Sequence, residues 1–459
     1  MATTSLPRLV VFNVPKAGTN TYVYRKDDGS VVDGENDKFS ELVKIEVERS
    51  KTNNERVHLR FSHKNRYWQK NASDDSIVAV SNKPEEDTTK ASCTLFEPVQ
   101  QSDNVVYLTH VQTGWRVMLN NSTGGFYVDK NSVGAPLGFV DWDTLVKLPK
   151  HVAFLGDNGK YLKALGHNGF KYLQFGIDDP NDILSGNEVS LMRDGHVRIK
   201  SDLWGLYWRW ASNWIYVDSD DVTANNKSTL FWPVKINENT IALRSAGNGL
   251  FCKRLTEDGM ESCLNAGVSN ITSEARLQVQ ELVMERKIYN VTYRMEDARI
   301  YGETPYLAGT TTVDNYADEA GSIAVSLKYK DTSSYYFTRS VSLTAGVTHT
   351  MTAGIPGIGE AGIEMSAEIS TEMEWNDKTT KTIEVSARGS VPVPAKSSAV
   401  VHYVGTRGTC DVPFSYTQRD RSSTDGKITQ TEQIDGVFTG VNNYGFKFTV
   451  EKYQPLPDQ

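Results

Sequence analysis

The residues with the clearest potential for chemistry are aromatic side chains that occur near amides in the first 216 residues. A sugar is recognised by a flat aromatic face against its C–H groups and by short polar side chains at its hydroxyls. Two stretches have this composition, which predicts carbohydrate binding. The candidates are Asn65, Tyr67, Trp68 and Trp115 in the first stretch and Tyr207, Trp208, Asn213, Trp214 and Tyr216 in the second. Packing into a hydrophobic core is the alternative for each aromatic, and the sequence leaves it open.

Signatures of catalysis are absent from the sequence. It contains no His-Glu-x-x-His, Gly-x-Ser-x-Gly or P-loop pattern. His58 and His63 are not at a metal-ligand spacing, and Asp178-Asp179 lacks the pattern of a calcium loop. We therefore expect no metal, no cofactor and no enzymatic activity. A glycosidase stays open as a rival, because sequence does not give the separation of two carboxylates.

Residues 341–375 show an alternation that predicts a long amphipathic hairpin. Odd positions are mostly apolar, whereas even positions carry hydroxyls, glycines or carboxylates, and successive side chains of a strand point to opposite faces. With a turn at Pro356–Gly359, the hairpin folds about Ile358 and pairs Met351 with Met365. The predicted apolar face consists of Val341, Leu343, Val347, Met351, Ile355, Ile358, Ile363, Met365, Ile369, Met373 and Trp375.

This hairpin has the pattern of strands that cross a membrane in a β-barrel. Strands of about 15 residues extend ~50 Å, enough for a ~30 Å hydrocarbon core even when tilted. One hairpin leaves backbone groups unpaired in lipid, so several chains must form the barrel together. A half-buried hairpin on a soluble sandwich is the alternative. The acidic residues of the other face, which would line the lumen and favour cations, are Glu360, Glu364, Glu368, Glu372 and Glu374.

Short strands are expected to position the aromatic candidates. The first 285 residues contain two sets of such strands, marked by repeated sequence motifs. The segment Thr94–Val99 (TLFEPV) recurs as Thr229–Val234 (TLFWPV), and Tyr67-Trp68 recurs as Tyr207-Trp208. Such ordered repeats predict two copies of one domain, at 1–148 and 149–285, with the Leu-Phe-x-Pro-Val repeats in the core. The strands are separated by the turn dipeptides Asp28-Gly29, Asp33-Gly34, Asn158-Gly159, Asn168-Gly169, Asp194-Gly195 and Asn248-Gly249.

The fold class expected from this pattern is all-β, with barrels or trefoils in the first two domains. Only residues 273–288 suggest a helix. Residues 286–459 form a third domain of different build, because eight of the nine tryptophans precede residue 286 and long Ser/Thr-rich strands follow it.

Composition and charge narrow the classes of partner. The net charge of −8 disfavours nucleic acid, since binding there depends on neutralising phosphates. No window of 18 apolar residues predicts a membrane-spanning helix. The apolar run Leu9–Phe12 is too short for a secretory signal, so we expect a cytoplasmic protein. In that compartment Cys252 and Cys263 are expected to stay reduced.

With its Tyr-Trp and Leu-Phe-x-Pro-Val repeats, the duplicated segment resembles the amaranthin-like agglutinins, plant lectins with two β-trefoil domains. Residues 286–459, with Ser/Thr-rich strands around an amphipathic hairpin, resemble the aerolysin-like pore-forming proteins, which implies an elongated β-sandwich. Together the resemblances imply a chimerolectin. Its trefoils would bind Gal/GalNAc-type cell-surface glycans, and its third domain would form a ring of like chains and insert into the bilayer.

The biology that these resemblances imply is plant defence, with storage in the cytoplasm as a monomer or dimer and action at target-cell membranes after release. The rival from the same class is a non-lytic plant lectin whose third domain only mediates oligomerisation. Leakage from vesicles that bear the right glycan distinguishes the two.

Overall fold

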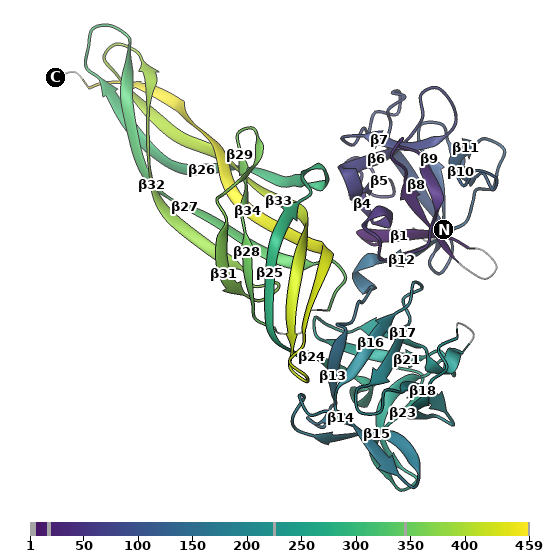
Figure 1. Ribbon diagram of the computed structural model, residues 1–459. Coiled ribbons are helices and arrows are strands. Elements are labelled where there is room, and N and C mark those ends of the chain that lie inside the picture. Colours follow the sequence, from purple (N-terminus) through teal and green to yellow (C-terminus); the bar gives the residue numbers. More distant parts are fainter. Residues whose placement is uncertain (1–5, 16–19, 224–225, 344–346, 458–459) are drawn as a thin grey trace. The chain divides into compact units, whose positions relative to one another are not determined.

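The computed structural model describes residues 6–15, 20–223, 226–343 and 347–457 (Figure 1). The chain forms two compact units: unit 1 is Met1–Glu285, Val341–Val347 and Asp420–Thr429, and unit 2 is Arg286–Ser340, Thr348–Arg419 and Gln430–Gln459. No helix in the described ranges is long and apolar enough to span a membrane. The helical residues found there form short 3-10 turns, at η1 (Glu41–Val43), η2 (His63–Asn65), η3 (Trp142–Thr144), η4 (Lys227–Thr229), η5 (Ser273–Ala275) and η6 (Met295–Asp297). The predicted all-β class is confirmed.

Unit 1 contains two antiparallel sheets of twelve strands, which we call module 1 and module 2. Module 1 consists of β1 (Leu9–Val14), β2 (Thr21–Arg25), β3 (Val31–Glu35), β4 (Ile45–Arg49), β5 (Val57–Phe61), β6 (Arg66–Lys70), β7 (Ile77–Ser81), β8 (Leu95–Ser102), β9 (Val105–His110), β10 (Trp115–Leu119), β11 (Phe126–Asp129) and β12 (Leu137–Asp141). Module 2 consists of β13 (His151–Leu155), β14 (Tyr161–His167), β15 (Phe170–Ile177), β16 (Asn187–Leu191), β17 (Val197–Ser201), β18 (Tyr207–Ala211), β19 (Trp214–Ser219), β20 (Phe231–Lys235), β21 (Thr240–Ser245), β22 (Phe251–Glu257), β23 (Met260–Val268) and β24 (Leu277–Glu281). Both modules are consistent with trefoil-like folds, and a boundary at residue 148 stays a prediction.

The repeated motifs build the hydrophobic cores of the two modules. Trp68 is fully buried in module 1 with Phe96 edge-on at 6.2 Å, and Trp208 is fully buried in module 2 with Phe231 edge-on at 6.1 Å. The phenylalanine and proline of each Leu-Phe-x-Pro-Val repeat are buried as predicted, whereas Val99, Leu230 and Val234 are half-buried. The ring contacts also show that the tryptophan of each Tyr-Trp repeat packs in a core, where burial removes a large apolar surface from water.

Turn chemistry explains most of the strand boundaries, and one predicted turn is wrong. Five of the six dipeptides form turns; Asn168 and Gly169 have φ of +49° and +82°, as a tight hairpin turn requires. Asp33-Gly34 instead lies inside β3, where the pairing with β2 shifts register. Gly34, with φ of +153°, is therefore the extra residue of a bulge.

The predicted helix at 273–288 is also wrong. Beyond the turn η5, the residues form β24 and the start of β25 (Val283–Tyr293). In β24, Leu277 and Val279 are buried and Gln278 is exposed. This period of two is the pattern of a strand and overrides the helix propensity of the Glu and Leu residues.

Unit 2 is built from strands that are several times longer than the usual five to six residues. Its long strands are β25, β26 (Arg299–Asn315), β27 (Gly321–Arg339), β32 (Thr379–Val393), β33 (Ser397–Ser422) and β34 (Ile428–Pro455), and its short strands are β28 (His349–Ala353), β29 (Pro356–Gly359), β30 (Gly362–Met365) and β31 (Ile369–Met373). The main sheet has the order β31-β28-β25-β33-β34-β27-β32, with β26 paired to β33. The strands β29 and β30 form a separate two-stranded sheet.

Candidate functional site

The amphipathic segment of unit 2 forms a hairpin, but with a different register from the one predicted. The turn consists of Glu360 and Ala361, and Ile358 lies opposite Ile363. Pro356–Gly359 is a strand and not the turn. Proline is tolerated there because it is the first residue of the strand. Gly362, with φ of +124°, supplies the backbone conformation that closes the hairpin.

The hairpin is also shorter than predicted. Its ladder begins where His349 pairs with Met373, and Met351 lies opposite Thr371, not Met365. Val341 and Leu343 belong to unit 1: the Leu343 side chain packs in the core of module 2, and the backbone N–H of Leu343 donates to Lys147 O at 2.9 Å. Val347 is assigned to unit 1 as well and precedes the ladder. These three residues are therefore not part of the hairpin face.

The apolar face of the hairpin packs against the main sheet of unit 2. Its base is buried, and so is the middle of the strand that runs toward the turn; Met365 and Ile369 on the returning strand are 45% and 43% exposed. The buried hairpin residues include His349, Met351, Ala353, Ile358, Met373 and Trp375. All of these except His349 form one hydrophobic cluster with Ile288, Phe337, Cys410, Val412, Phe414, Tyr416 and Phe438 of the sheet. Ile355 and Ile363 are half-buried beside this cluster.

The glutamates lie on the side of the hairpin that faces water. Glu360, Glu364, Glu368 and Glu372 are exposed, while Glu374 is half-buried and accepts a hydrogen bond from Thr348 Oγ1 at 3.2 Å. The apolar residues of β28 and β29 and of the hairpin base are therefore stored against protein, whereas Met365 and Ile369 are exposed like the glutamates.

Four of the nine sugar-binding candidates are buried, so they present no face to a ligand, which corrects the prediction. Trp68 and Trp208 are core residues, and Tyr67 and Trp214 are also buried. Trp208 Nε1 donates to Asn187 Oδ1 at 3.0 Å. The other five candidates are partly or fully exposed: Asn65, Trp115, Tyr207, Asn213 and Tyr216. Asn65 accepts a hydrogen bond from Arg60.

Tyr216 belongs to an aromatic shelf on module 2, defined by Phe170, Tyr172 and Tyr216. The Tyr172 and Tyr216 rings lie 4.9 Å apart on paired strands, and the Phe170 ring lies 6.2 and 6.0 Å from them. Burial and a hydrogen bond with Tyr216 raise the pKa of Tyr172 to about 12, so its hydroxyl stays protonated. Trp214 supports the shelf from below, edge-on to Tyr172 at 6.3 Å.

Polar groups border the shelf. The Arg209 guanidinium lies 5.7 Å from the Tyr216 ring and forms two 2.7 Å hydrogen bonds to the carboxylate of Asp218. An aromatic face beside a fixed ion pair fits the chemistry of sugar recognition. Sequence reasoning missed Phe170 and Tyr172, although the Asn168-Gly169 turn followed by alternating aromatics indicates an aromatic hairpin end.

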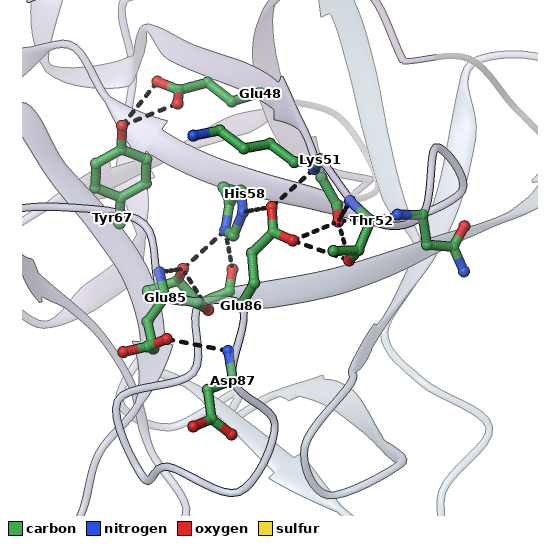
Figure 2. A network of polar contacts seen from close by, with 11 residues as sticks. Glu48, Lys51, Thr52, His58, Tyr67, Glu85, Glu86 and Asp87 are labelled. Atoms are coloured by element: carbon green, nitrogen blue, oxygen red, sulfur yellow. Dashed lines mark hydrogen bonds and ion pairs between the residues drawn. The ribbon is translucent and has the colours of Figure 1, made fainter.

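Module 1 contains a polar network around His58, Thr94 and Glu86 (Figure 2). His58 Nδ1 lies 2.7 Å from Thr94 Oγ1, and His58 Nε2 lies 3.5 Å from Glu86 Oε1. Glu86 also accepts from Lys51 N at 2.8 Å and Thr52 Oγ1 at 2.9 Å. Both His58 and Thr94 are buried, so no substrate reaches the hydroxyl. The network instead connects the segment around Glu86 to the end of β4 and to β5, so the role of His58 is structural.

Stability should depend on Glu86 at low pH. Burial alone would raise the pKa of the Glu86 carboxyl, but the hydrogen bonds from Lys51, Thr52, His58 and Ser50 lower it from 4.5 to about 2. The carboxylate therefore stabilises the fold above pH 4.5, and this contribution is lost as the pH falls toward 2. We expect Glu86→Gln to cost about 1–2 kcal/mol at pH 7.

Urea titrations of the wild type and the Glu86→Gln variant at several pH values test this expectation. The difference in unfolding free energy between them should shrink as the pH falls below 4.5. A difference that stays constant down to pH 2 would contradict it.

Comparison with known proteins identifies the family of unit 1. A family model described as Agglutinin domain matches residues 29–135 and 146–283, more than half of the chain. The chain belongs to the agglutinin domain family. The agglutinin resemblance seen in the repeats is thus confirmed, and each of the two predicted copies contains most or all of one matched range.

Similar proteins include natterins of Thalassophryne nattereri. Natterin-1 is 31% identical over 155 residues, which cover 34% of this agglutinin chain and 43% of the relative. Natterin-4 is 29% identical over 165 residues, which cover 36% of this chain and 42% of the relative. The chain thus spans less than half the length of these relatives.

Two solved structures are similar over larger parts of the chain. A mosquitocidal holotoxin is 10% identical, with 62% of this chain and 35% of that chain covered, and a lamprey immune protein is 10% identical, with 76% and 87% covered. Both have a TM-score of 0.29. At this score the likenesses do not define the fold or the function of this chain.

Proposed function

We propose that the chain is a carbohydrate-binding pore-forming protein without enzymatic activity, in which the agglutinin modules bind Gal/GalNAc-type glycans and the hairpin of unit 2 inserts into the bilayer. The observation that carries this proposal is the stored hairpin: the apolar residues of β28, β29 and the hairpin base lie against a sheet, while Glu360, Glu364, Glu368 and Glu372 face water. When such a hairpin inserts, its apolar side chains would contact lipid and no longer protein, and its charged side chains would stay in the water-filled lumen.

The length of the hairpin supports insertion even after the correction of its ends. The rising side of the hairpin, from His349 to Gly359, consists of β28, two linking residues and β29, and as one continuous strand it would extend ~36 Å at ~3.3 Å per residue. A tilt of roughly 40° leaves ~28 Å along the membrane normal, close to the ~30 Å hydrocarbon core. Its free edges require a closed ring of like chains, and the glutamate rings in the lumen would favour cations.

For the glycan we propose the aromatic shelf of module 2. Its rings provide a C–H stacking face, and Arg209 and Asp218 provide fixed polar groups at its border. This assignment retains Tyr216 from the sequence candidates and adds Phe170 and Tyr172. We also propose storage in the cytoplasm and action in plant defence after release, on the resemblance to plant agglutinins.

Dye-loaded vesicles with and without a GalNAc-terminated glycolipid test the function. The wild type should bind and release dye only where the glycolipid is present. Phe170→Ala should weaken vesicle binding roughly 2- to 10-fold through the lost ring contact. Ile183→Ala is the matched control, because Ile183 and Phe170 are both 55% exposed on module 2. Binding without leakage would support the non-lytic lectin, and turnover of a chromogenic galactoside would support the glycosidase.

A further inference from the structure

The tip of the hairpin is held by side chains and not by a strand ladder. The strands β29 and β30 pair only with each other in the described structure. At the base, β28 pairs with β25 through two registered positions, Lys287 with Thr350 and Ile288 with Met351. Between base and tip, Tyr293 Oη donates to Gly354 O at 2.7 Å. Few backbone hydrogen bonds therefore have to break for the hairpin tip to separate from the main sheet of unit 2.

The Ile358 side chain packs over Gly408 and beside Tyr444, in a site that we call its seat and that depends on the absence of a side chain at Gly408. It is 4% exposed, although it lies only two residues from the exposed turn. A Cβ at Gly408 would lie 3.0 Å from Ile358 Cδ1 and 3.1 Å from Cε1 of Tyr444, tighter than ordinary van der Waals contact. Tyr444 Oη bonds to Glu303, which fixes this wall of the seat.

The side-chain amide of Asn442 then forms two hydrogen bonds with the backbone of Ile358. Asn442 Oδ1 accepts from the backbone N–H of Ile358 at 2.9 Å, and Asn442 Nδ2 donates to the carbonyl of Ile358 at 2.8 Å. The side chain thus bonds both backbone groups of one residue, as a neighbouring strand would. A carboxylate of the same shape could accept from the N–H but would face the carbonyl with a second acceptor.

We propose that Asn442, together with the seat over Gly408, is the latch that keeps the insertion hairpin stored. This inference rests on the proposed function for its purpose, but the latch itself is a property of the protein in solution. Because it consists of two hydrogen bonds and one seated side chain, opening it leaves the main sheet intact. The latch would set how readily the hairpin leaves before it meets a membrane.

Hydrogen exchange of the full-length protein, read by mass spectrometry over 349–373, tests the latch without a membrane. Asn442→Asp should speed exchange at the hairpin tip roughly 10-fold or more, since two hydrogen bonds are weakened or lost. Gly408→Ala is the second variant and should act in the same direction by displacing Ile358.

Asn443→Ala is the matched control. Asn443 is the next residue of β34, and its side chain bonds Arg407 and Asp331 and not the hairpin. Faster tip exchange in Asn442→Asp and Gly408→Ala, with tip exchange in Asn443→Ala close to the wild type, supports the latch. Unchanged tip exchange in both variants, or an equal change in the control, overturns it. Vesicle leakage tests pore formation separately. Faster hydrogen exchange at the tip, with no leakage from any variant or from the wild type, would contradict the proposed function but would still support the latch.

Discussion

Joining β25 to β28 through Lys287→Cys and Thr350→Cys is expected to abolish vesicle leakage under oxidising conditions and to restore it on reduction. The two positions are registered neighbours on parallel strands, where backbones lie ~4.8 Å apart, within the Cα separation that a disulfide spans. Because Thr350 is the second residue of β28, the disulfide holds the base of the hairpin on the sheet and leaves the aromatic shelf of module 2 unchanged.

The controls for the disulfide are direct. Each single cysteine variant should leak like the wild type with and without reductant. The four native cysteines are free and buried, which limits unwanted pairing. Glycolipid binding should be unchanged in the oxidised double variant. Full leakage from that variant, with the disulfide shown to be formed, would contradict release of the hairpin.

A charge on the lipid-facing side should block insertion without unfolding the soluble protein. Ile369 is exposed at 43% in the stored hairpin, so Ile369→Arg should change the unfolding free energy by no more than about 0.5 kcal/mol. In a barrel the same side chain would meet lipid, where an arginine costs about 2–4 kcal/mol near the bilayer centre. This penalty lowers insertion roughly 30- to 1000-fold per chain.

Ser370→Arg is the matched control, because Ser370 is the exposed neighbour on the opposite face of β31. It should leak like the wild type, since its side chain would lie in the lumen. Reversal potentials in a planar bilayer add a second readout, and less cation preference is expected for this variant. Equal leakage from both arginine variants would contradict the assignment of the two faces.

The sequence by itself determined the features that depend on local pattern and on comparison of the chain with itself. The all-β class follows from turn dipeptides and strand periodicity, and the repeat around Trp68 and Trp208 identified two related modules. The alternation of residues 341–375 predicted one apolar and one acidic face, because side-chain direction on a strand is fixed by the backbone. In the structure the apolar residues of β28 and β29 and of the hairpin base are buried, and Glu360, Glu364, Glu368 and Glu372 are exposed.

Only the tertiary structure decided which aromatic residues are exposed and where the hairpin turns. A tryptophan on a short strand has the same local sequence whether it faces a core or a ligand, and both repeated tryptophans face cores. The hairpin register depended on Gly362 and on packing against β25 and β33, segments that are distant in sequence. The contact of Asn442 with Ile358 joins residues 84 positions apart, and no local pattern contains it, because such contacts exist only once distant strands are brought together.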